Sequence, residues 1–142
     1  ERYARLHETA RSMGITLVHE NVERSVSRDP ELFRVLRREI PDAAFALDLK
    51  QAVRAGFAPL EMIQAMGPNL CHVHISDAGP QESCLPIGKG TVDFPKLLAA
   101  LREQGFDGCL ALELYSTSYQ DPQDLERSVA ALERMVEDLS AR

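Results

Sequence analysis

The sequence has few of the features that mark membrane, nucleic-acid-binding or disulfide-stabilised proteins. No apolar run approaches the roughly 18 residues of a membrane-spanning helix, and no signal-peptide pattern opens the sequence. Basic residues number 16 against 22 acidic ones, a net charge of −6, whereas nucleic-acid binders normally carry a basic surplus. The three cysteines have neither the spacing of a zinc knuckle nor the even number of a disulfide framework. We therefore expect no membrane partner, no nucleic-acid partner and a cytoplasmic location.

The composition is that of an ordinary globular protein. With 142 residues, 44% of them hydrophobic and 27% charged, the chain is long enough for one domain with a buried core. We expect a single domain over residues 1–142. The sequence begins at Glu1, and residues 3–13 already show the apolar spacing of a helix, with Leu6 and Met13 on its apolar stripe. This opening predicts a piece of a longer chain.

Helix and strand patterns alternate along the whole sequence. Short apolar runs predict strands at 15–20, 44–49, 70–76 and 109–114. Apolar residues three and four apart, with capping and terminating residues at the ends, predict helices at 3–13, 30–40, 59–66, 94–101 and 122–139. Residues 78–92 are predicted to form a long polar loop. Alternation of this kind implies a parallel sheet with right-handed crossovers, here four βα units preceded by a helix.

Each predicted strand ends in a side chain that can bind a metal ion. These residues are Glu20, Asp48, His74 and Glu113, and about one βα unit separates each from the next. In a doubly wound sheet a ligand draws mainly on two neighbouring strands, whereas a TIM barrel carries its chemistry on the C-terminal ends of its strands. The sequence therefore predicts an α/β fold of four parallel strands alternating with helices, which is half of a (β/α)8 barrel.

The four strand ends together form a plausible set of metal ligands. Three carboxylates and one imidazole suit a divalent ion such as Mn²⁺, Mg²⁺, Co²⁺ or Zn²⁺. The alternative is that these side chains are only solvated or cap the following helices, and their recurrence in four strands favours the metal site. Because side chains alternate along a strand, His72 shares the face of His74. A core histidine and a substrate contact are both open for His72.

Five short motifs carry a resemblance to a known family. They occupy residues 17–21, 46–48, 72–77, 86–94 and 108–113. In these motifs the chain resembles the C-terminal half of the xylose isomerase-like TIM barrels, a superfamily of sugar phosphate isomerases and epimerases that also includes endonuclease IV-type enzymes. The resemblance covers nearly the whole sequence, and the third and fourth motifs are its most specific parts.

The resemblance implies a metal-dependent reaction and a role for each strand end. It implies that Glu20, Asp48, His74 and Glu113 bind one divalent ion, and that Glu20 and Glu113 also act as the acid/base pair. A metal that bridges a substrate carbonyl and the neighbouring hydroxyl acidifies the C–H between them. One glutamate would remove that proton and the other would return it. The expected function is an isomerase or epimerase of a small sugar, polyol or hydroxy-keto compound.

Four further residues are candidates for substrate binding or support. His72, Gln51 and Lys89 are candidate substrate contacts, and Asp77 would orient His72, fix the following loop or simply cap a turn. Members of the family often carry a histidine where this chain has Gln51, whose amide hydrogen-bonds a hydroxyl but does not easily shuttle a proton. Lys89 would supply a positive charge, or else be an ordinary solvated loop lysine.

Other functions stay open beside the expected one. A lyase that dehydrates a keto-inositol or similar sugar uses the same proton abstraction. An endonuclease IV-like phosphodiesterase needs more histidines and a basic surface, which the four histidines and the acidic balance oppose. A half-barrel without turnover, binding only metal or a partner, is the third alternative. Because its outer strands would be unpaired, we expect a homo-oligomer or association with a missing N-terminal half.

Overall fold

The structure is a computed structural model and describes residues 2–141. The strands are β1 (Val18–Glu20), β2 (Ala44–Asp48), β3 (Leu70–Ile75), β4 (Asp77–Ala78), β5 (Ser83–Leu85) and β6 (Cys109–Leu112). The α-helices are α1 (Arg2–Ser12), α2 (Pro30–Glu39), α3 (Leu49–Arg54), α4 (Pro59–Met66), α5 (Phe94–Glu103) and α6 (Gln123–Ser140). Two short 3₁₀ helices, η1 (Val26–Arg28) and η2 (Gly67–Asn69), complete the described elements.

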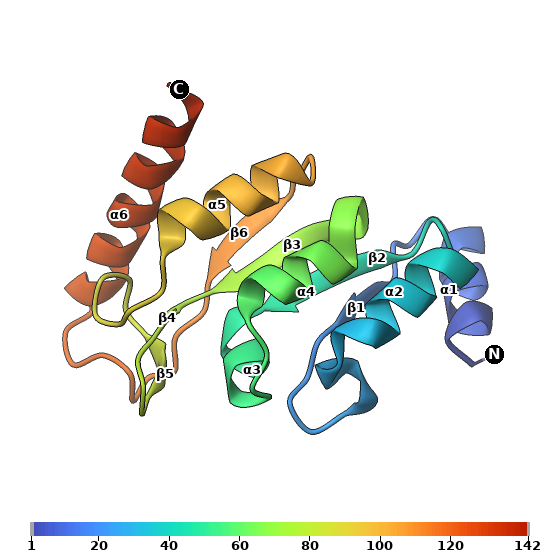
Figure 1. Cartoon of the computed structure of the whole chain (residues 1–142), viewed down its shortest axis with the longest axis horizontal. Helices are drawn as coiled ribbons and strands as arrows, with labels where there is room; N and C mark the ends of the chain where they lie inside the picture. Colours follow the sequence, from blue (N-terminus) through green and yellow to red (C-terminus); the bar gives the residue numbers. More distant parts are fainter. Residues whose placement is uncertain (1, 142) are drawn as a thin grey trace.

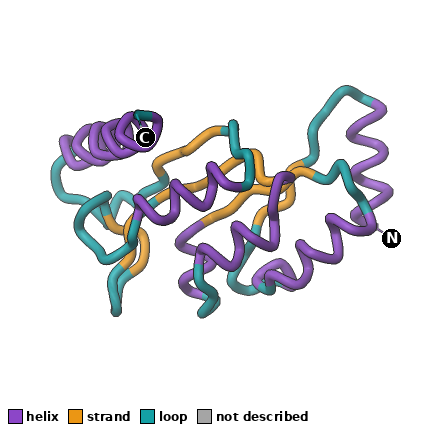
Figure 2. The backbone as a smooth tube through the Cα atoms, turned by 45° about the horizontal axis from the view of Figure 1, so that its top comes forward, coloured by secondary structure: helices purple, strands orange, loops and turns teal. Residues whose placement is uncertain are grey.

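A four-stranded parallel sheet forms the centre of the molecule. Its strand order is β1-β2-β3-β6, and helices α2, α4 and α5 lie along one of its faces (Figures 1 and 2). Parallel strands need such crossover connections, and the helices bury the face that they cover. The core between helices and sheet includes Phe33, Phe45, Leu47, Met62, Ile63, Val73 and Leu98. The expected alternation of four strands with helices is therefore present.

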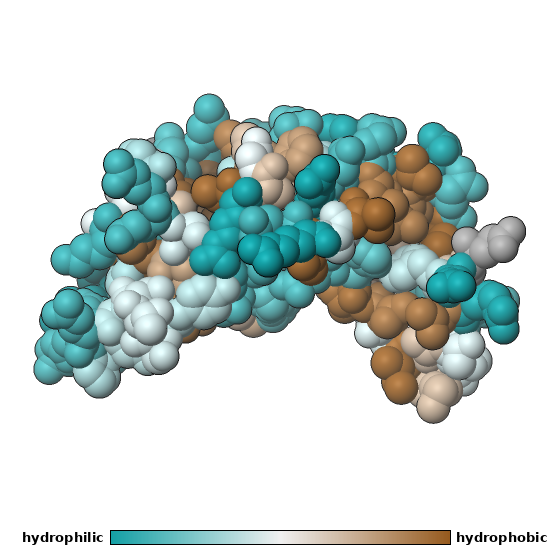
Figure 3. All heavy atoms as spheres, turned by 90° about the horizontal axis from the view of Figure 1, so that it is seen from below, coloured by the Kyte–Doolittle hydropathy of each residue, from teal (hydrophilic) through white to brown (hydrophobic). Residues whose placement is uncertain are grey.

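The opposite face of the sheet carries the polar strand residues. The register aligns Asp48 with His74, and His74 with Ala111, so these three side chains share one face. The molecule is shaped like an arch, hollow on the side away from the helices (Figure 3). The C-terminal ends of all four strands thus deliver their side chains to one edge of this hollow.

Helix α3 is a difference from the sequence prediction. Residue Leu49, predicted to extend a strand, is the first residue of this helix. The reason is local: Asp48 ends β2 and caps α3, because its Oδ1 accepts a hydrogen bond from the backbone N–H of Gln51 at 3.0 Å. A strand-end ligand and a helix cap are therefore the same side chain.

The predicted polar loop contains a small hairpin, β4 paired with β5 in antiparallel fashion. The buried carboxylate of Asp77 holds it in place by accepting hydrogen bonds from the backbone N–H groups of Gly88 (2.9 Å), Gly90 (2.8 Å) and Val92 (3.1 Å). Gly90 must lack a side chain, because a Cβ there would run into the Asp77 carboxylate and the Ala78 carbonyl. This single side chain orders a segment that shows no periodicity in the sequence.

The two ends of the arch expose apolar side chains. Leu6 on α1 and Met13 just after it are 61% and 68% exposed, although the predicted stripe includes both. Tyr3, on the same helix, packs against the core. At the other end, Val129 and Val136 of α6 are exposed beside β6. Within residues 2–141, no helix combines the length and the apolar character that crossing a membrane requires.

Candidate metal centre

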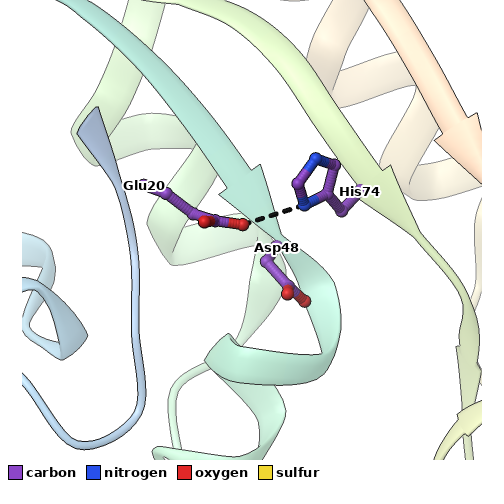
Figure 4. A group of neighbouring side chains, drawn as sticks. All are labelled: Glu20, Asp48 and His74. Atoms are coloured by element: carbon purple, nitrogen blue, oxygen red, sulfur yellow. Dashed lines mark ion pairs between the residues drawn. The ribbon is translucent and has the colours of Figure 1, made fainter. Parts of the chain in front are cut away.

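Three of the four predicted ligands meet at the C-terminal ends of neighbouring strands. One ligand atom from each of Glu20, Asp48 and His74 lies within 4.8 Å of the other two (Figure 4). Glu20 ends β1, Asp48 ends β2, and His74 lies near the end of β3. Two ligands of one ion, each about 2.1 Å from it, are about 3–4 Å apart, so only small side-chain adjustments separate this arrangement from a closed site.

Asp48 is the most firmly fixed member of the cluster. Its side chain is 4% exposed, and each of its two oxygens has a partner. Oδ1 caps helix α3, and Oδ2 lies 3.2 Å from the ammonium of Lys50. A carboxylate held in this way cannot rotate away from the strand end, which is what a metal ligand requires.

Asn21 ties the first strand to the second. It is fully buried, its Nδ2 donates to the carbonyl of Asp48 at 3.0 Å, and its Oδ1 accepts from the backbone N–H of Asp48 at 2.8 Å. Because Asn21 directly follows Glu20, this pair of hydrogen bonds sets the position of the Glu20 backbone relative to Asp48. Asn21 belongs to the motif at residues 17–21, but no role was predicted for it from the sequence.

His74 faces two glutamates from the outer strands. Its Nδ1 lies 2.8 Å from Glu20 Oε1 and 3.1 Å from Glu113 Oε2 (Figure 4 shows the first pair). The angles do not make either contact a hydrogen bond, so Nδ1 and Glu113 Oε2 are buried without a hydrogen-bond partner among the described residues. Buried polar atoms normally have partners, and a nitrogen lone pair beside carboxylate oxygens is a donor set that suits a divalent cation. The residues present therefore fit a metal ion.

Lys50 is a site residue that the sequence did not single out. Its side chain is 3% exposed, and its Nζ lies 2.9 Å from Glu113 Oε1 as well as 3.2 Å from Asp48 Oδ2. The ring of Tyr115 covers the ammonium, with 4.7 Å between Nζ and the ring centroid. Burial alone lowers the pKa of Lys50, but its hydrogen bonds and charge interactions with Glu113 and Asp48 outweigh that effect and raise the pKa above its ordinary value.

The remaining predicted site residues lie at different distances from this cluster. His72 stacks edge-on against His74, with ring centroids 4.8 Å apart. The side-chain oxygen of Gln51 accepts a hydrogen bond from the backbone N–H of Glu23 at 2.9 Å, so it braces the loop after β1. Lys89 is exposed on the loop after the hairpin. Asp77 accepts hydrogen bonds from the loop that carries Lys89. The proposed contacts of His72, Gln51 and Lys89 with a substrate, and the orientation of His72 by Asp77, stay predictions.

Comparisons with known proteins place the chain in a family. Residues 1–135 match the family described as xylose isomerase-like TIM barrel. Inosose dehydratase from Lacticaseibacillus casei is 26% identical over 138 residues, which cover 83% of this chain and 45% of that protein.

Solved structures agree with this assignment. A D-tagatose 3-epimerase-like protein superposes with a TM-score of 0.75 at 23% identity, over 98% of this chain and 53% of that one. D-allulose 3-epimerase from Methylomonas sp. superposes with a TM-score of 0.63 at 26% identity, over 89% of this chain and 44% of that one. The chain thus spans about half the length of the proteins it matches, and the prediction of half a (β/α)8 barrel is confirmed. The chain belongs to the xylose isomerase-like TIM barrel family.

Proposed function

We propose that the chain carries the metal and proton-transfer half of a divalent-metal-dependent isomerase or epimerase site for a small sugar, polyol or hydroxy-keto compound. The observation that carries the proposal is the convergence of Glu20 and Glu113 on one nitrogen of His74, from strands at opposite edges of the sheet. The sugar epimerases among its structural relatives support the same class of reaction.

The side chains divide the work by position. Glu20, Asp48 and His74 form the ligand cluster, and Glu113 reaches it from β6. A divalent ion bound there, such as Mn²⁺, Mg²⁺, Co²⁺ or Zn²⁺, supplies a Lewis acid that polarises a substrate carbonyl. Glu20 and Glu113 are both partly exposed, at 37% and 40%, so their carboxylates reach a substrate in the hollow. One takes the proton from the carbon beside the carbonyl and the other delivers a proton to the opposite side.

Proton exchange with solvent tests this proposal directly. The chain, supplied with Mn²⁺ and a panel of ketoses and keto-polyols in D₂O, is expected to exchange a C–H proton for deuterium, followed by NMR. Glu20→Gln and Glu113→Gln should each abolish the exchange, whereas Glu103→Gln, at the exposed end of α5, should not. Exchange that survives both site substitutions would contradict the assigned acid/base pair. Mn²⁺ binding without exchange by the wild-type chain would favour a non-catalytic, metal-binding half-barrel.

A dehydratase is the second candidate, and the similarity to inosose dehydratase favours it. Both reactions begin with removal of a proton next to a carbonyl and use the same carboxylates. They differ in the product, because an epimerase keeps the mass of the substrate and a dehydratase releases one water. Mass spectrometry of the products from the same panel separates the two. An endonuclease IV-like phosphodiesterase predicts cleavage of abasic DNA instead, and we expect none.

We also infer that the chain associates with a second copy of itself. The outer edges of β1 and β6 have no strand partner among residues 2–141. Val18 of β1 and Leu6 of α1 are exposed, and beside β6 a groove of about 420 Å³ is lined by residues that include Leu110, Leu112 and Val129. Two copies related by a two-fold axis would pair β6 of one with β1 of the other twice, and the eight strands would form a closed barrel.

A further inference from the structure

Lys50 forms ion pairs with two carboxylates that are also predicted to bind the metal ion. Its ammonium bridges one oxygen of Asp48 and one oxygen of Glu113, at 3.2 Å and 2.9 Å, and both carboxylates belong to the predicted ligand set. A side chain with 3% exposure has lost its water, so these carboxylates are its main compensation. A cation of this chain therefore already occupies two of the carboxylate oxygens that a metal would use.

We propose that Lys50 is a positioning residue that acts as an internal counter-cation of the metal centre, competing with the metal ion for Asp48 and Glu113 and leaving one oxygen of Glu113 without a hydrogen bond. This inference rests on the proposed metal centre and deepens it. The free oxygen of Glu113 is Oε2, the buried atom that faces His74 Nδ1 without a hydrogen bond. Lys50 thus turns Glu113 so that one oxygen points at the cluster and the other is taken.

The aromatic cover over Lys50 supports a fixed position for the ammonium. Tyr115 lies over Nζ, and the guanidinium of Arg54 lies 5.4 Å from the same ring and donates to the Tyr115 hydroxyl at 3.2 Å. Arg54 is itself held by a 2.7 Å hydrogen bond to Ser83 on the hairpin. These contacts hold the Tyr115 ring over the ammonium and favour a fixed position for Lys50 beside the two carboxylates.

The charge balance gives this arrangement a chemical consequence. Three carboxylates and one ammonium leave two negative charges at the centre, which a divalent ion neutralises. Without the ammonium, the loaded centre would keep a negative charge and would oppose the negative charge that develops on a substrate as its proton leaves. Lys50 therefore weakens metal binding, but it lets the metal-bound centre stabilise the negative charge on the substrate more strongly.

Metal titration distinguishes this role from a merely structural one. In Lys50→Met and Lys50→Gln, the Mn²⁺ affinity measured by calorimetry is expected to rise on the order of tenfold or more, because a positive charge in contact with two of the predicted ligands is removed. The thermal midpoint of the metal-free variants should fall, because Asp48 and Glu113 lose their common partner. If the role of Lys50 were purely structural, its replacement would lower both the Mn²⁺ affinity and the thermal midpoint. The glutamine variant retains hydrogen bonding and guards against a methionine variant that fails to fold.

The controls separate this inference from the proposed function. Lys96→Met removes the same charge from an exposed position on α5 and should leave the affinity unchanged. Asp48→Asn tests the metal centre itself and should abolish binding. If Asp48→Asn abolishes binding but neither neutral Lys50 variant binds more tightly, the role of Lys50 is wrong and the centre stands. If no variant and no wild-type chain binds Mn²⁺, both proposals fall. If only the neutral variants bind, Lys50 is confirmed as the competitor and the native centre is not a metal site.

Discussion

The carboxylate at the end of the inner strand β2 and the two carboxylates of the outer strands lie in very different settings. Asp48, at the end of β2, is 4% exposed and has partners on both oxygens. Glu20, at the end of β1, and Glu113, just beyond β6, have side chains that are 37% and 40% exposed. A carboxylate bound on all sides is suited to hold an ion, whereas one with a free side is suited to move a proton. We therefore expect the inner carboxylate to act as a fixed ligand and the two outer glutamates to combine metal binding with proton transfer.

Glu20→Gln is expected to give the largest effect, because it removes a proton-transferring group while leaving the fold intact. Catalytic proton exchange should fall by about 10²–10⁴-fold, the usual contribution of a positioned general acid or base. The free energy of unfolding should change by less than about 0.5 kcal/mol, because the side chain is partly exposed, at 37%, and residues 2–141 form no hydrogen bond to its carboxylate. The exchange assay checks the predicted loss of proton transfer, and denaturant unfolding checks the predicted stability. A large loss of stability would mean that the outer carboxylate is structural.

Asp48→Asn should show the opposite pattern at the inner position. The amide keeps an oxygen for capping α3, but the buried Lys50 loses one of its two counter-charges. Breaking a buried ion pair on one side costs about 3–5 kcal/mol, and the surviving contact with Glu113 places the expected loss near the lower end, about 3 kcal/mol. Urea unfolding of the metal-free chain measures it. A variant as stable as the wild type would show that the inner carboxylate is no better fixed than the outer ones.

The periodic parts of the fold could be predicted from the sequence, because alternation and capping are local. The strand at Ala44–Asp48 and the helix that begins at Pro30 after the cap Asp29 were found in this way, and so was the placement of Glu20, Asp48 and His74 together. A period of two in a strand fixes which side chains share a face before any tertiary contact is known.

The interactions that join distant segments could not be predicted. Lys50 contacts Glu113 across 63 residues, and its burial depends on α3 starting directly after Asp48. The sequence instead suggested Lys89 as a positive charge for the substrate, with an ordinary solvated loop lysine as the alternative. The hydrogen bonds of Asp77 to Gly88, Gly90 and Val92 also have no local pattern. One feature of the sequence could have indicated Lys50. Asp48 ends a strand and can cap a helix, so a helix that begins directly after it keeps Lys50 close to the strand ends.

The edges of the sheet offer a third test, on association rather than catalysis. The wild-type chain should sediment as a dimer or larger species at micromolar concentration, because its open edges carry exposed apolar residues such as Val18. Val18→Lys places a charge on the edge strand and should weaken this association without changing stability by more than about 0.5 kcal/mol. Val26→Lys makes the same change at an exposed residue of η1, outside both edge strands, and is the matched control. A monodisperse monomer of the wild type would contradict the prediction.

The smallest effect is expected at His19, whose position on β1 next to Glu20 puts its side chain on the helix-covered face. Its ring packs edge-on between Tyr3 and Phe33, with centroid separations of 5.0 Å and 5.8 Å. Burial lowers the pKa of His19 in the folded chain. As the pH falls through about 6.5, the unfolded chain therefore takes up a proton that the folded chain refuses, and stability declines.

His19→Phe retains an aromatic ring and removes the titrating group. Urea unfolding from pH 7.5 to 5.5, on the metal-free chain, should show a smaller loss of stability with falling pH in the variant than in the wild type. At the upper end of the range, where His19 is neutral in both the folded and the unfolded chain, the stability of the two proteins should change with pH by the same amount. Equal pH dependence of the two proteins would mean that the His19 ring is hydrated in the folded chain. In that case even the helix-covered face of β1 is open to water, and the contrast between inner and outer strands extends to both faces of the sheet.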